Sequence, residues 1–289
     1  MMKIYLDFCL DYNLLPLDPS VSTILCYLEF LACRLKSPKS ISNYWSAVKL
    51  IHEVNRVQLS NINDIQVKLM LRSLSFTKRH VSVQKLPLSS AQLQNMCSIL
   101  DSYGLPGLTI KCALLIGFYG FLRASNICQQ KNHSFDSSRH FTRSDVKITK
   151  SGLVLQLKWA KNMQCSLQPK NISIPSVKDE SVDPAATFKR MCSLVPAGPN
   201  SPLFMLHHNQ PLTVEKLRSV FRHLCDKIDL DHSVFSLHSL RRGGATEAYI
   251  KGATPVDIQR HGAWQSLTFW DYVYPTFNNP STVCQALSS

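Results

Sequence analysis

Clustered metal ligands are missing from this chain of 289 residues. Its ten cysteines are scattered, with no CxxC pair and no regular spacing, a usage typical of reduced thiols inside a cell rather than of a disulfide framework. A zinc site needs several Cys or His ligands close together, and the pair His207 and His208 has no cysteine near it in the sequence. We therefore expect no metal and no other cofactor, and we expect both histidines on a loop or at the surface.

Long apolar runs are also absent. No uninterrupted apolar stretch approaches the roughly 20 residues that a membrane-spanning helix needs. Asp7 and Asp11 interrupt the apolar N-terminal segment, which argues against a secretory signal peptide. We expect a soluble, intracellular protein without a membrane partner, located in the nucleus if the host is a eukaryote and otherwise in the cytoplasm or nucleoid.

Acidic residues are few. The chain has 19 Asp and Glu against 32 Lys and Arg, which gives a formal net charge of +13 and a pI of about 9.3. Such an excess attracts a polyanion by counterion release, although a solvated basic surface has the same composition. Nothing in the sequence resembles the carboxylate cluster that holds two metal ions in nucleases and transposases. The charge therefore favours a nucleic-acid partner. It does not indicate a reaction, which has to be inferred from the sequence motifs.

Residues 1–80 are predicted to form a small helical domain. Apolar residues recur at helical spacing after a cap at Ser22, after a second start at Ser40, and in a third helix from Asp64 to about Phe76. A solvated face explains any single lysine on such helices, yet phosphates are contacted by the same residue types. Four cations of this domain are predicted to contact DNA: Arg34, Lys36, Lys39 and Lys49.

Residues 81–88 lack periodicity and contain a proline, so we predict a linker there, followed by a second domain over residues 89–289. Ser89 and Gln92 have the spacing of a capping box, which marks the first helix of that domain. Three cations in or near the linker are further predicted DNA contacts: Lys78, Arg79 and Lys85. A buried helix is expected over 105–122, three short strands over 146–149, 153–159 and 171–175, and later helices from about 184 and 213. The fold class is therefore mainly α with a small β-sheet.

The segment 237–246 carries the most informative motif of the chain, Leu-His-Ser-Leu-Arg-Arg-Gly-Gly-Ala-Thr. His238 and Arg241 lie three residues apart, so on a helix they face the same way. Both then reach one phosphate, the arginine as a planar fork of donors and the histidine as a proton carrier. Arg242 points about 100° away around the helix and is predicted to be structural. The glycine pair after it allows a close approach to another element or to DNA.

Four further residues complete a set in which order and context are specific. Arg123 follows the stretch Gly-Phe-Tyr-Gly-Phe-Leu, Lys161 follows the second predicted strand, and Tyr272 comes eight residues after Trp264. Taken singly, such an arginine is usually stabilised by a helix dipole, a loop lysine is usually exposed charge, and a tyrosine is usually part of the core. The combination requires another explanation.

Read in order as Arg, Lys, His-x-x-Arg, Trp and Tyr, the sequence resembles the tyrosine recombinases of the phage-integrase and Xer type, of the kind found in eukaryotic mobile elements. The resemblance covers nearly the whole chain. It implies a helical, SAM-like core-binding domain and a catalytic domain that close around double-stranded DNA, with four copies assembled during synapsis. It also implies that DNA is broken and rejoined through a covalent 3′-phosphotyrosine, without metal or nucleotide.

The same resemblance implies a role for each residue of the set. Arg123 and Arg241 bind the scissile phosphate, and Lys161 gives a proton to the departing 5′-oxygen. His238 handles the proton of the nucleophile Tyr272. The sixth residue, which donates its indole N–H to the phosphate, is Trp264. A phenol has a pKa near 10 in model peptides, so it needs the base and the cations around it before it attacks phosphorus.

Several assignments keep a competitor. His261 competes with Trp264, although the spacing of eight residues to Tyr272 resembles one subgroup of the family and favours the tryptophan. Tyr274 competes with Tyr272 as the nucleophile, and Lys158 lies three residues before Lys161. A tyrosine directly before a proline is more often packed.

Two other functions stay open at this stage. One is a DNA-binding protein that keeps the recombinase fold without turnover, and the other is an activity like that of type IB topoisomerases. Asn126 motivates the first, because many relatives carry an acidic residue at its position, although asparagine still accepts a hydrogen bond. The short tail after Pro275 motivates it too, because relatives use a tail to join neighbouring subunits.

Overall fold

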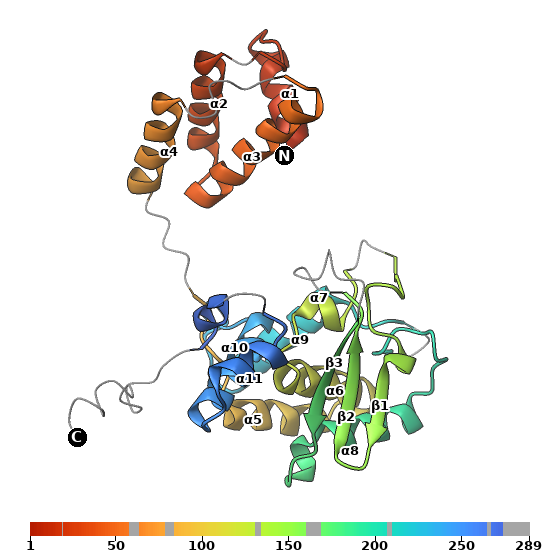
Figure 1. Ribbon diagram of the computed structural model, residues 1–289. Coiled ribbons are helices and arrows are strands. Elements are labelled where there is room, and N and C mark those ends of the chain that lie inside the picture. The colour runs from red at the N-terminus through yellow and green to blue at the C-terminus, as the bar shows by residue number, and fades with distance from the viewer. Residues whose placement is uncertain are drawn as a thin grey trace, which may run out of the picture. The chain divides into compact units, whose positions relative to one another are not determined.

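The computed structural model describes residues 1–18, 20–57, 64–78, 84–130, 134–159, 169–206, 210–264 and 267–273. The chain divides into two compact units, Met1–Val83 and Gln84–Ser289 (Figure 1). Helices dominate, and one three-stranded antiparallel sheet lies in the second unit. This confirms the predicted fold class. Within the described ranges, no helix has both the length and the apolar character needed to cross a bilayer.

The described residues of the first unit form four helices around one apolar core. They are α1 (Met2–Asp11), α2 (Val21–Arg34), α3 (Pro38–Val54) and α4 (Ile65–Thr77). The helix starts differ in part from prediction. Ser20, not Ser22, caps α2 by accepting the N–H of Thr23, and α3 begins at Pro38, before Ser40, because proline fits the first turn of a helix. Asp64 caps α4 as predicted, by accepting the N–H of Gln66 at 2.7 Å.

The second unit contains the remaining helices. Its first two are α5 (Ser90–Asp101), which begins with the predicted Ser89–Gln92 capping box, and α6 (Gly104–Tyr119), which ends before the predicted residue 122. The others are α7 (Ala124–Ile127), α8 (Pro184–Leu194), α9 (Val214–Lys227), α10 (Leu237–Ile250) and α11 (Pro255–His261). Short 3-10 turns cover Arg143–Asp145, Glu180–Val182 and Leu267–Asp271.

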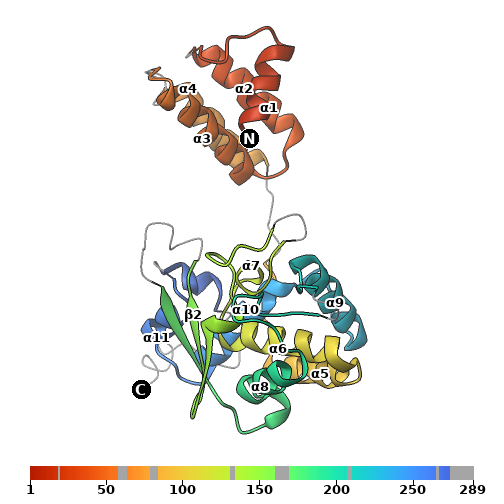
Figure 2. The ribbon, with the colours of Figure 1, turned by 90° about the vertical axis from the view of Figure 1, so that its right-hand side faces the viewer.

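The sheet has the order β1 (Val146–Thr149), β2 (Gly152–Leu157) and β3 (Lys170–Pro175), with antiparallel pairs that place Leu155 opposite Val146 and Ile172. Strand β2 stops at Leu157, two residues before the predicted end. Five apolar side chains of the two strands are almost fully buried: Leu153, Leu155 and Leu157 of β2, and Ile172 and Ile174 of β3. Figure 2 shows the sheet on one side of the unit and α9 on the other, with α6 between them.

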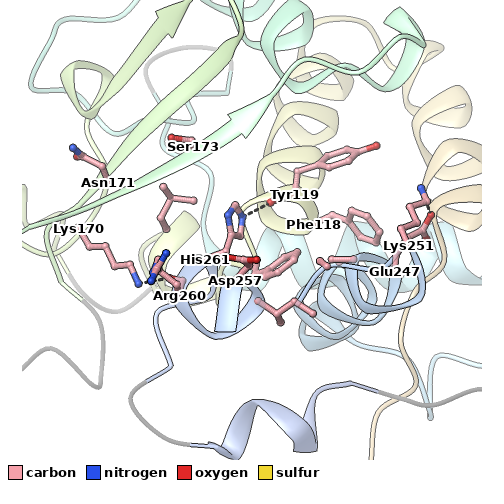
Figure 3. A pocket seen from close by; sticks show the side chains of 16 residues that line it. Phe118, Tyr119, Lys170, Asn171, Ser173, Glu247, Lys251, Asp257, Arg260 and His261 are labelled. Atoms are coloured by element: carbon pink, nitrogen blue, oxygen red, sulfur yellow. Dashed lines mark hydrogen bonds and ion pairs between the residues drawn. The ribbon is translucent and has the colours of Figure 1, made fainter. Parts of the chain in front are cut away.

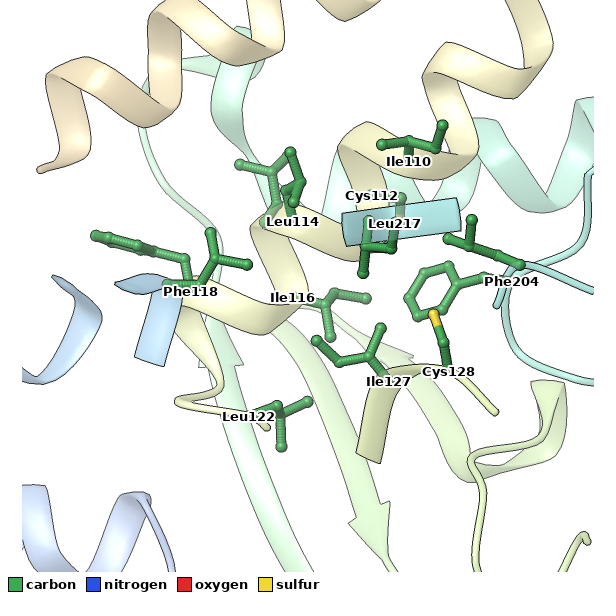
Figure 4. Close-up of a cluster of buried hydrophobic side chains, with 14 of the residues drawn as sticks. Ile110, Cys112, Leu114, Ile116, Phe118, Leu122, Ile127, Cys128, Phe204 and Leu217 are labelled. Carbon is green, nitrogen blue, oxygen red and sulfur yellow. The ribbon is translucent and has the colours of Figure 1, made fainter. Parts of the chain in front are cut away.

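Helix α6 lies at the centre of the second core because its sequence is apolar on every side. Figure 4 shows Ile116 of α6 beside Ile127, and both belong to the same buried cluster as Leu114, Phe118 and Leu217. Helix α10 packs against α6 at its glycine pair. A Cβ on Gly243 would collide with the carbonyl of Leu88, and one on Gly244 would collide with that of Phe118. The close approach predicted for these glycines is therefore made to protein, and it sets the position of α10.

The described part of the predicted linker, residues 84–88, packs on the second unit. The Leu86 N–H donates to the Val234 carbonyl at 2.9 Å, and the Leu88 N–H donates to the Ser239 carbonyl at 3.0 Å. Leu88 is fully buried, and the Lys85 ammonium donates to the Ser233 carbonyl. The division between the units falls before Gln84. Residues 84–88, which precede α5, therefore belong to the second unit, where these hydrogen bonds attach them to the start of α10 and the segment before it.

Candidate functional site

Helix α10 presents the two residues of the His-x-x-Arg motif. Ser236 caps the helix by accepting the His238 N–H at 3.2 Å, and its own N–H donates to the Ser239 hydroxyl at 3.0 Å. This capping fixes the first turn, which carries His238, and the next turn carries Arg241 on the same side. The 3-10 turn Leu267–Asp271 then brings Tyr272 back to α10.

Four of the predicted catalytic side chains meet in one cluster. The rings of His238 and Tyr272 have centroids 4.9 Å apart, and those of Trp264 and Tyr272 are 5.1 Å apart. The guanidinium carbon of Arg241 lies 3.9 Å from the Trp264 ring centroid and 5.2 Å from that of Tyr272. The phenol of Tyr272 thus contacts the imidazole, the indole and the guanidinium, although Tyr272 comes 34 residues after His238 in the chain.

Arg241 is a buried cation, with 2% of its surface exposed. It donates to the backbone carbonyls of Phe121 and Gly262, the second at 2.9 Å. No carboxylate of the described residues pairs with it, and its Nε–H has no partner among them. Burial, followed by the charge of Arg123, lowers the pKa of its guanidinium, while Tyr272 opposes this shift. The Nε–H is therefore a buried donor that the described residues leave unsatisfied.

Arg123 lies half-buried immediately before α7. Its positive charge lowers the pKa of both Arg241 and His238. Asn126 holds its backbone, because the Asn126 Oδ1 accepts the Arg123 N–H at 3.2 Å. The Asn126 Nδ2 donates to the Trp159 carbonyl at 3.1 Å.

His238 is neutral at physiological pH. The pKa of the imidazole is lowered from 6.5 to about 4, chiefly because burial removes water from it. The positive charges of Arg241, Arg242 and Arg123 lower it further. One side of the residue stays exposed to solvent. A neutral imidazole against the Tyr272 ring has a free lone pair, so it accepts a proton from a phenol in contact with it.

Trp264 lies inside the cluster, 5% exposed. Its ring packs over Gly262, where a Cβ would collide with the indole, and the intervening Ala263 takes a φ of 54°. The indole N–H has no hydrogen-bond partner in the described part of the chain. A buried donor without a partner is costly unless a ligand satisfies it.

The competing residues have other partners. The His261 Nε2–H donates to the Tyr119 carbonyl at 2.8 Å, and its ring meets Phe121 at 4.6 Å. His261 lines a cavity of about 520 Å³ between α6, α10, α11 and β3 (Figure 3). The Lys158 ammonium lies 2.8 Å from the Asp145 carboxylate. Both are therefore committed to contacts outside the cluster.

Two further predicted residues, Lys161 and Tyr274, lie outside the described residues, as do Arg79, His207 and His208. The predicted DNA contacts Arg34, Lys36 and Lys39 are exposed, and Lys49 and Lys78 are half-buried. The Arg34 guanidinium lies 4.0 Å from the Phe30 ring centroid. Lys85 donates to a backbone carbonyl and is the least available of this group.

Two residues of α10 hold the backbone on both sides of the phenol. Arg242, predicted to be structural, donates to the Asp271 carbonyl. The Thr246 hydroxyl donates to the Tyr272 carbonyl at 3.2 Å. Sequence reasoning missed Thr246, because its partner is a backbone carbonyl 26 residues away and any residue type offers such an acceptor.

Comparison with known proteins bears on this arrangement. The family described as the phage integrase family matches residues 87–275, and a search of curated proteins returned no match. The chain is similar to the XerA recombinase, with 17% identity over 99% of this chain and 89% of that one and a TM-score of 0.50. It is also similar to the Tn1549 transposon integrase in complex with transposon right end DNA, with 18% identity over 93% and 85% and a TM-score of 0.58. At this identity the two structures establish the fold.

Proposed function

We propose that the chain, which belongs to the phage integrase family, is a site-specific DNA recombinase that cuts and rejoins strands through a covalent 3′-phosphotyrosine. The contact of Tyr272 with His238, Trp264 and Arg241 carries the proposal. A phenol beside a neutral base and a buried cation is equipped for attack on a phosphodiester. The similar Tn1549 integrase, a structure with transposon DNA, supports DNA as the substrate.

Each side chain has a distinct task in this mechanism. Arg123 and Arg241 bind the non-bridging oxygens of the phosphate and stabilise the charge that develops on five-coordinate phosphorus. His238 takes the phenolic proton as the Tyr272 oxygen bonds to phosphorus. The bond to the 5′-oxygen breaks, and this oxygen receives a proton from Lys161. The phosphotyrosine keeps the energy of the original bond, so a 5′-hydroxyl of a partner strand reverses the step without ATP.

The indole of Trp264 completes the phosphate site. Its N–H is buried without a partner in the described part of the chain, and it lies beside the Arg241 guanidinium. A bound phosphate oxygen supplies the missing acceptor. The cations of this site belong to the protein, so the reaction in this proposal needs no metal ion.

The first unit serves as the core-binding domain in this proposal. Residues 1–80 contact DNA phosphates through Arg34, Lys36, Lys39 and Lys49, and the catalytic domain of residues 89–289 contacts the other side of the duplex. The net charge of +13 supports such a clamp. Four copies act together during synapsis, in the nucleus if the host is a eukaryote and otherwise in the cytoplasm or nucleoid.

A suicide substrate tests the proposal, because a nick next to the cut site traps the covalent adduct. Wild-type protein is expected to form the adduct in EDTA without ATP, and Tyr272→Phe is expected to form none while binding the same DNA. Tyr249→Phe, which removes a hydroxyl elsewhere in the same unit, is the matched control. Binding without any adduct would instead identify a catalytically inactive DNA-binding protein. Mapping the linked peptide to Tyr274 would overturn the choice of nucleophile, and relaxation of supercoils without strand exchange would favour the topoisomerase interpretation.

A further inference from the structure

We infer that the cavity beside Arg123 is a nucleobase subsite, which takes the base of the nucleotide whose 5′-oxygen leaves and stacks it on the indole of Trp159. The inference rests on the proposed function, because that proposal places Arg123 at the scissile phosphate. It adds a contact to a base, whereas the proposed tasks of the cluster around Tyr272 concern only the phosphate.

The cavity lies between three parts of the second unit. Its walls come from the start of α7, the segment between α7 and β1, and the end of β2, and both Arg123 and Trp159 line it. Its volume is about 460 Å³, within the range of roughly 300–1,000 Å³ that is typical of small-molecule sites. A base and its phosphate belong to one nucleotide, so a nucleotide bound at Arg123 has its base within reach of this cavity.

The wall between α7 and β1 is held by contacts within the protein. The Lys158 ammonium donates to the Ser137 carbonyl of this wall at 3.0 Å and lies 2.8 Å from the buried Asp145 carboxylate. The Asp136 Oδ1 accepts the N–H and the hydroxyl of Ser138 at 2.9 and 2.6 Å. A wall that is already held binds a ligand without the cost of ordering it.

Trp159 offers the cavity a flat apolar surface. The residue is half-buried, and the guanidinium carbon of Arg139 lies 5.7 Å from its ring centroid. Aromatic rings and guanidinium planes are the groups on which proteins stack bases that have left a helix. Such stacking tolerates any sequence because every base has a π-face, so we expect the subsite to require a base without selecting one.

The charges of the lining favour a base over a second phosphate. Arg139 is paired with Asp136, because its Nε lies 3.6 Å from the Asp136 carboxylate. Arg123 is assigned to the scissile phosphate, and neutral side chains such as Gln130 and Ser134 also line the cavity. A neutral planar group with hydrogen-bonding edges suits this lining, whereas a second phosphate needs a cation that has no carboxylate beside it.

The place of Trp159 in the chain indicates which nucleotide is taken. Trp159 comes two residues before Lys161, the proposed proton donor to the departing 5′-oxygen, and two residues span at most roughly 7 Å. The indole therefore belongs to the leaving side of the cut in this mechanism. A base that leaves the duplex loses its stacking energy there, and the Trp159 ring offsets that loss.

A substrate that lacks this base tests the inference. Single-turnover cleavage is compared on an intact suicide substrate and on one whose leaving nucleotide is abasic. On the intact substrate, Trp159→Ala is expected to be slower than wild type by about tenfold or more, and Trp159→Phe, which keeps a ring, is expected to recover most of the rate. On the abasic substrate the three proteins are expected to be equally fast, because no base is left to stack.

Two controls accompany this comparison. An abasic residue farther from the cut is expected to leave the loss in W159A unchanged. Arg139→Ala removes the second stacking group at an exposed position, and its loss is again expected only on the intact substrate. An equal loss in W159A on both substrates would assign Trp159 a structural task and overturn the subsite.

Photo-crosslinking tests the contact without cleavage. A 5-iodouracil base is placed at each position in turn across an uncleaved duplex bound by Tyr272→Phe. We expect the strongest crosslink to the peptide that contains Trp159 to come from the leaving position, and to disappear when W159A is added. Crosslinks to other peptides only would overturn the subsite even if wild type forms the covalent adduct. If wild type forms no adduct while one position crosslinks to Trp159, the subsite stands and the proposed function fails.

Discussion

At the scale of single residues, the two arginines of the site differ in how much of their hydrogen-bonding capacity is already used. Arg241 is buried and donates to the carbonyls of Phe121 and Gly262, whereas Arg123 is half-buried and is held through its backbone by Asn126. Arg241 therefore has a structural task besides its proposed role at the phosphate. No such bond from the Arg123 side chain to a buried carbonyl is found among the described residues. Substitutions at the two positions are therefore expected to differ in their effect on the free energy of unfolding while both slow cleavage.

Arg123→Ala and Arg241→Ala are each expected to slow single-turnover cleavage by about two orders of magnitude, the usual effect of losing one preorganised donor. Only Arg241→Ala is expected to lower the free energy of unfolding as well, by about 1–3 kcal/mol, because two buried carbonyls lose their donor. Rates on a suicide substrate and urea unfolding of both variants measure the two effects. A parallel loss of DNA binding and cleavage would indicate a docking role instead.

The imidazole of His238 links the site to pH. Its pKa is lowered from 6.5 to about 4 by desolvation and by neighbouring arginines, and unfolding returns the pKa to its ordinary value. Between pH 4 and 6.5 the unfolded chain binds more protons at this residue than the folded protein does. Protonation of His238 therefore has no effect on the free energy of unfolding above about pH 6.5, and it lowers this free energy as the pH falls toward 4. We expect wild type to lose more stability than His238→Gln over this window in urea unfolding. Equal losses in the two proteins would contradict the lowered pKa.

At the scale of elements, α10 organises the site from both of its faces. One face presents His238 and Arg241 to the cluster, and the glycine pair places the helix against α6. Farther along, Arg242 and Thr246 hold the backbone at Asp271 and Tyr272. One helix therefore carries the proposed base, one cation and the attachment of the proposed nucleophile.

Thr246→Val tests this attachment, because it replaces the hydroxyl by a methyl group of similar size. Loss of the bond to the Tyr272 carbonyl is expected to slow cleavage by about two- to tenfold, corresponding to a net hydrogen bond of about 0.5–1.5 kcal/mol, with unchanged DNA affinity. Thr246→Ser is expected to restore the rate. Single-turnover kinetics with both variants measure this, and a valine variant as fast as wild type would show that the hydroxyl does not position the nucleophile.

The elements that the sequence predicted are those with local signals. The Ser89–Gln92 capping box was predicted correctly because both of its bonds form within four residues. Helix α1 was missed because Asp7 and Asp11 were interpreted only as interruptions of an apolar run. In the structure they lie on its exposed side, while Tyr5 and Phe8 fill the core.

The candidate site was predictable in its composition and not in its bonding. Residue types and order indicated His238, Arg241, Trp264 and Tyr272, and the structure brings these four together. The acceptors of Arg241, Asn126 and Thr246 are backbone carbonyls of distant segments. Every residue has a backbone carbonyl, so the sequence of side chains cannot predict which carbonyl accepts these hydrogen bonds before the fold is known.

At the scale of the whole molecule, the two units have separate hydrophobic cores. The first is built around Tyr5, Tyr27 and Trp45, and the second around α6 and the sheet. The clustered side chains His238, Arg241, Trp264 and Tyr272 all belong to the second unit. Removing the first unit therefore leaves the cluster and its core intact, which allows the contribution of each unit to DNA binding to be measured.

Deletion of residues 1–80 is expected to weaken DNA binding and to make its salt dependence shallower. The plot of log K against log [salt] falls by about 0.9 for each phosphate neutralised on duplex DNA, so each phosphate that the first unit no longer neutralises reduces the slope by that amount. Titrations at several salt concentrations on the full chain and the shortened chain measure the difference. A full-length variant with Arg34, Lys36, Lys39 and Lys49 replaced by glutamine is the matched comparison, because it removes the charges and keeps the helices. If the shortened chain keeps the full slope, the first unit does not neutralise phosphates and the clamp must be abandoned; if only the glutamine variant keeps it, other residues of the first unit bind the phosphates.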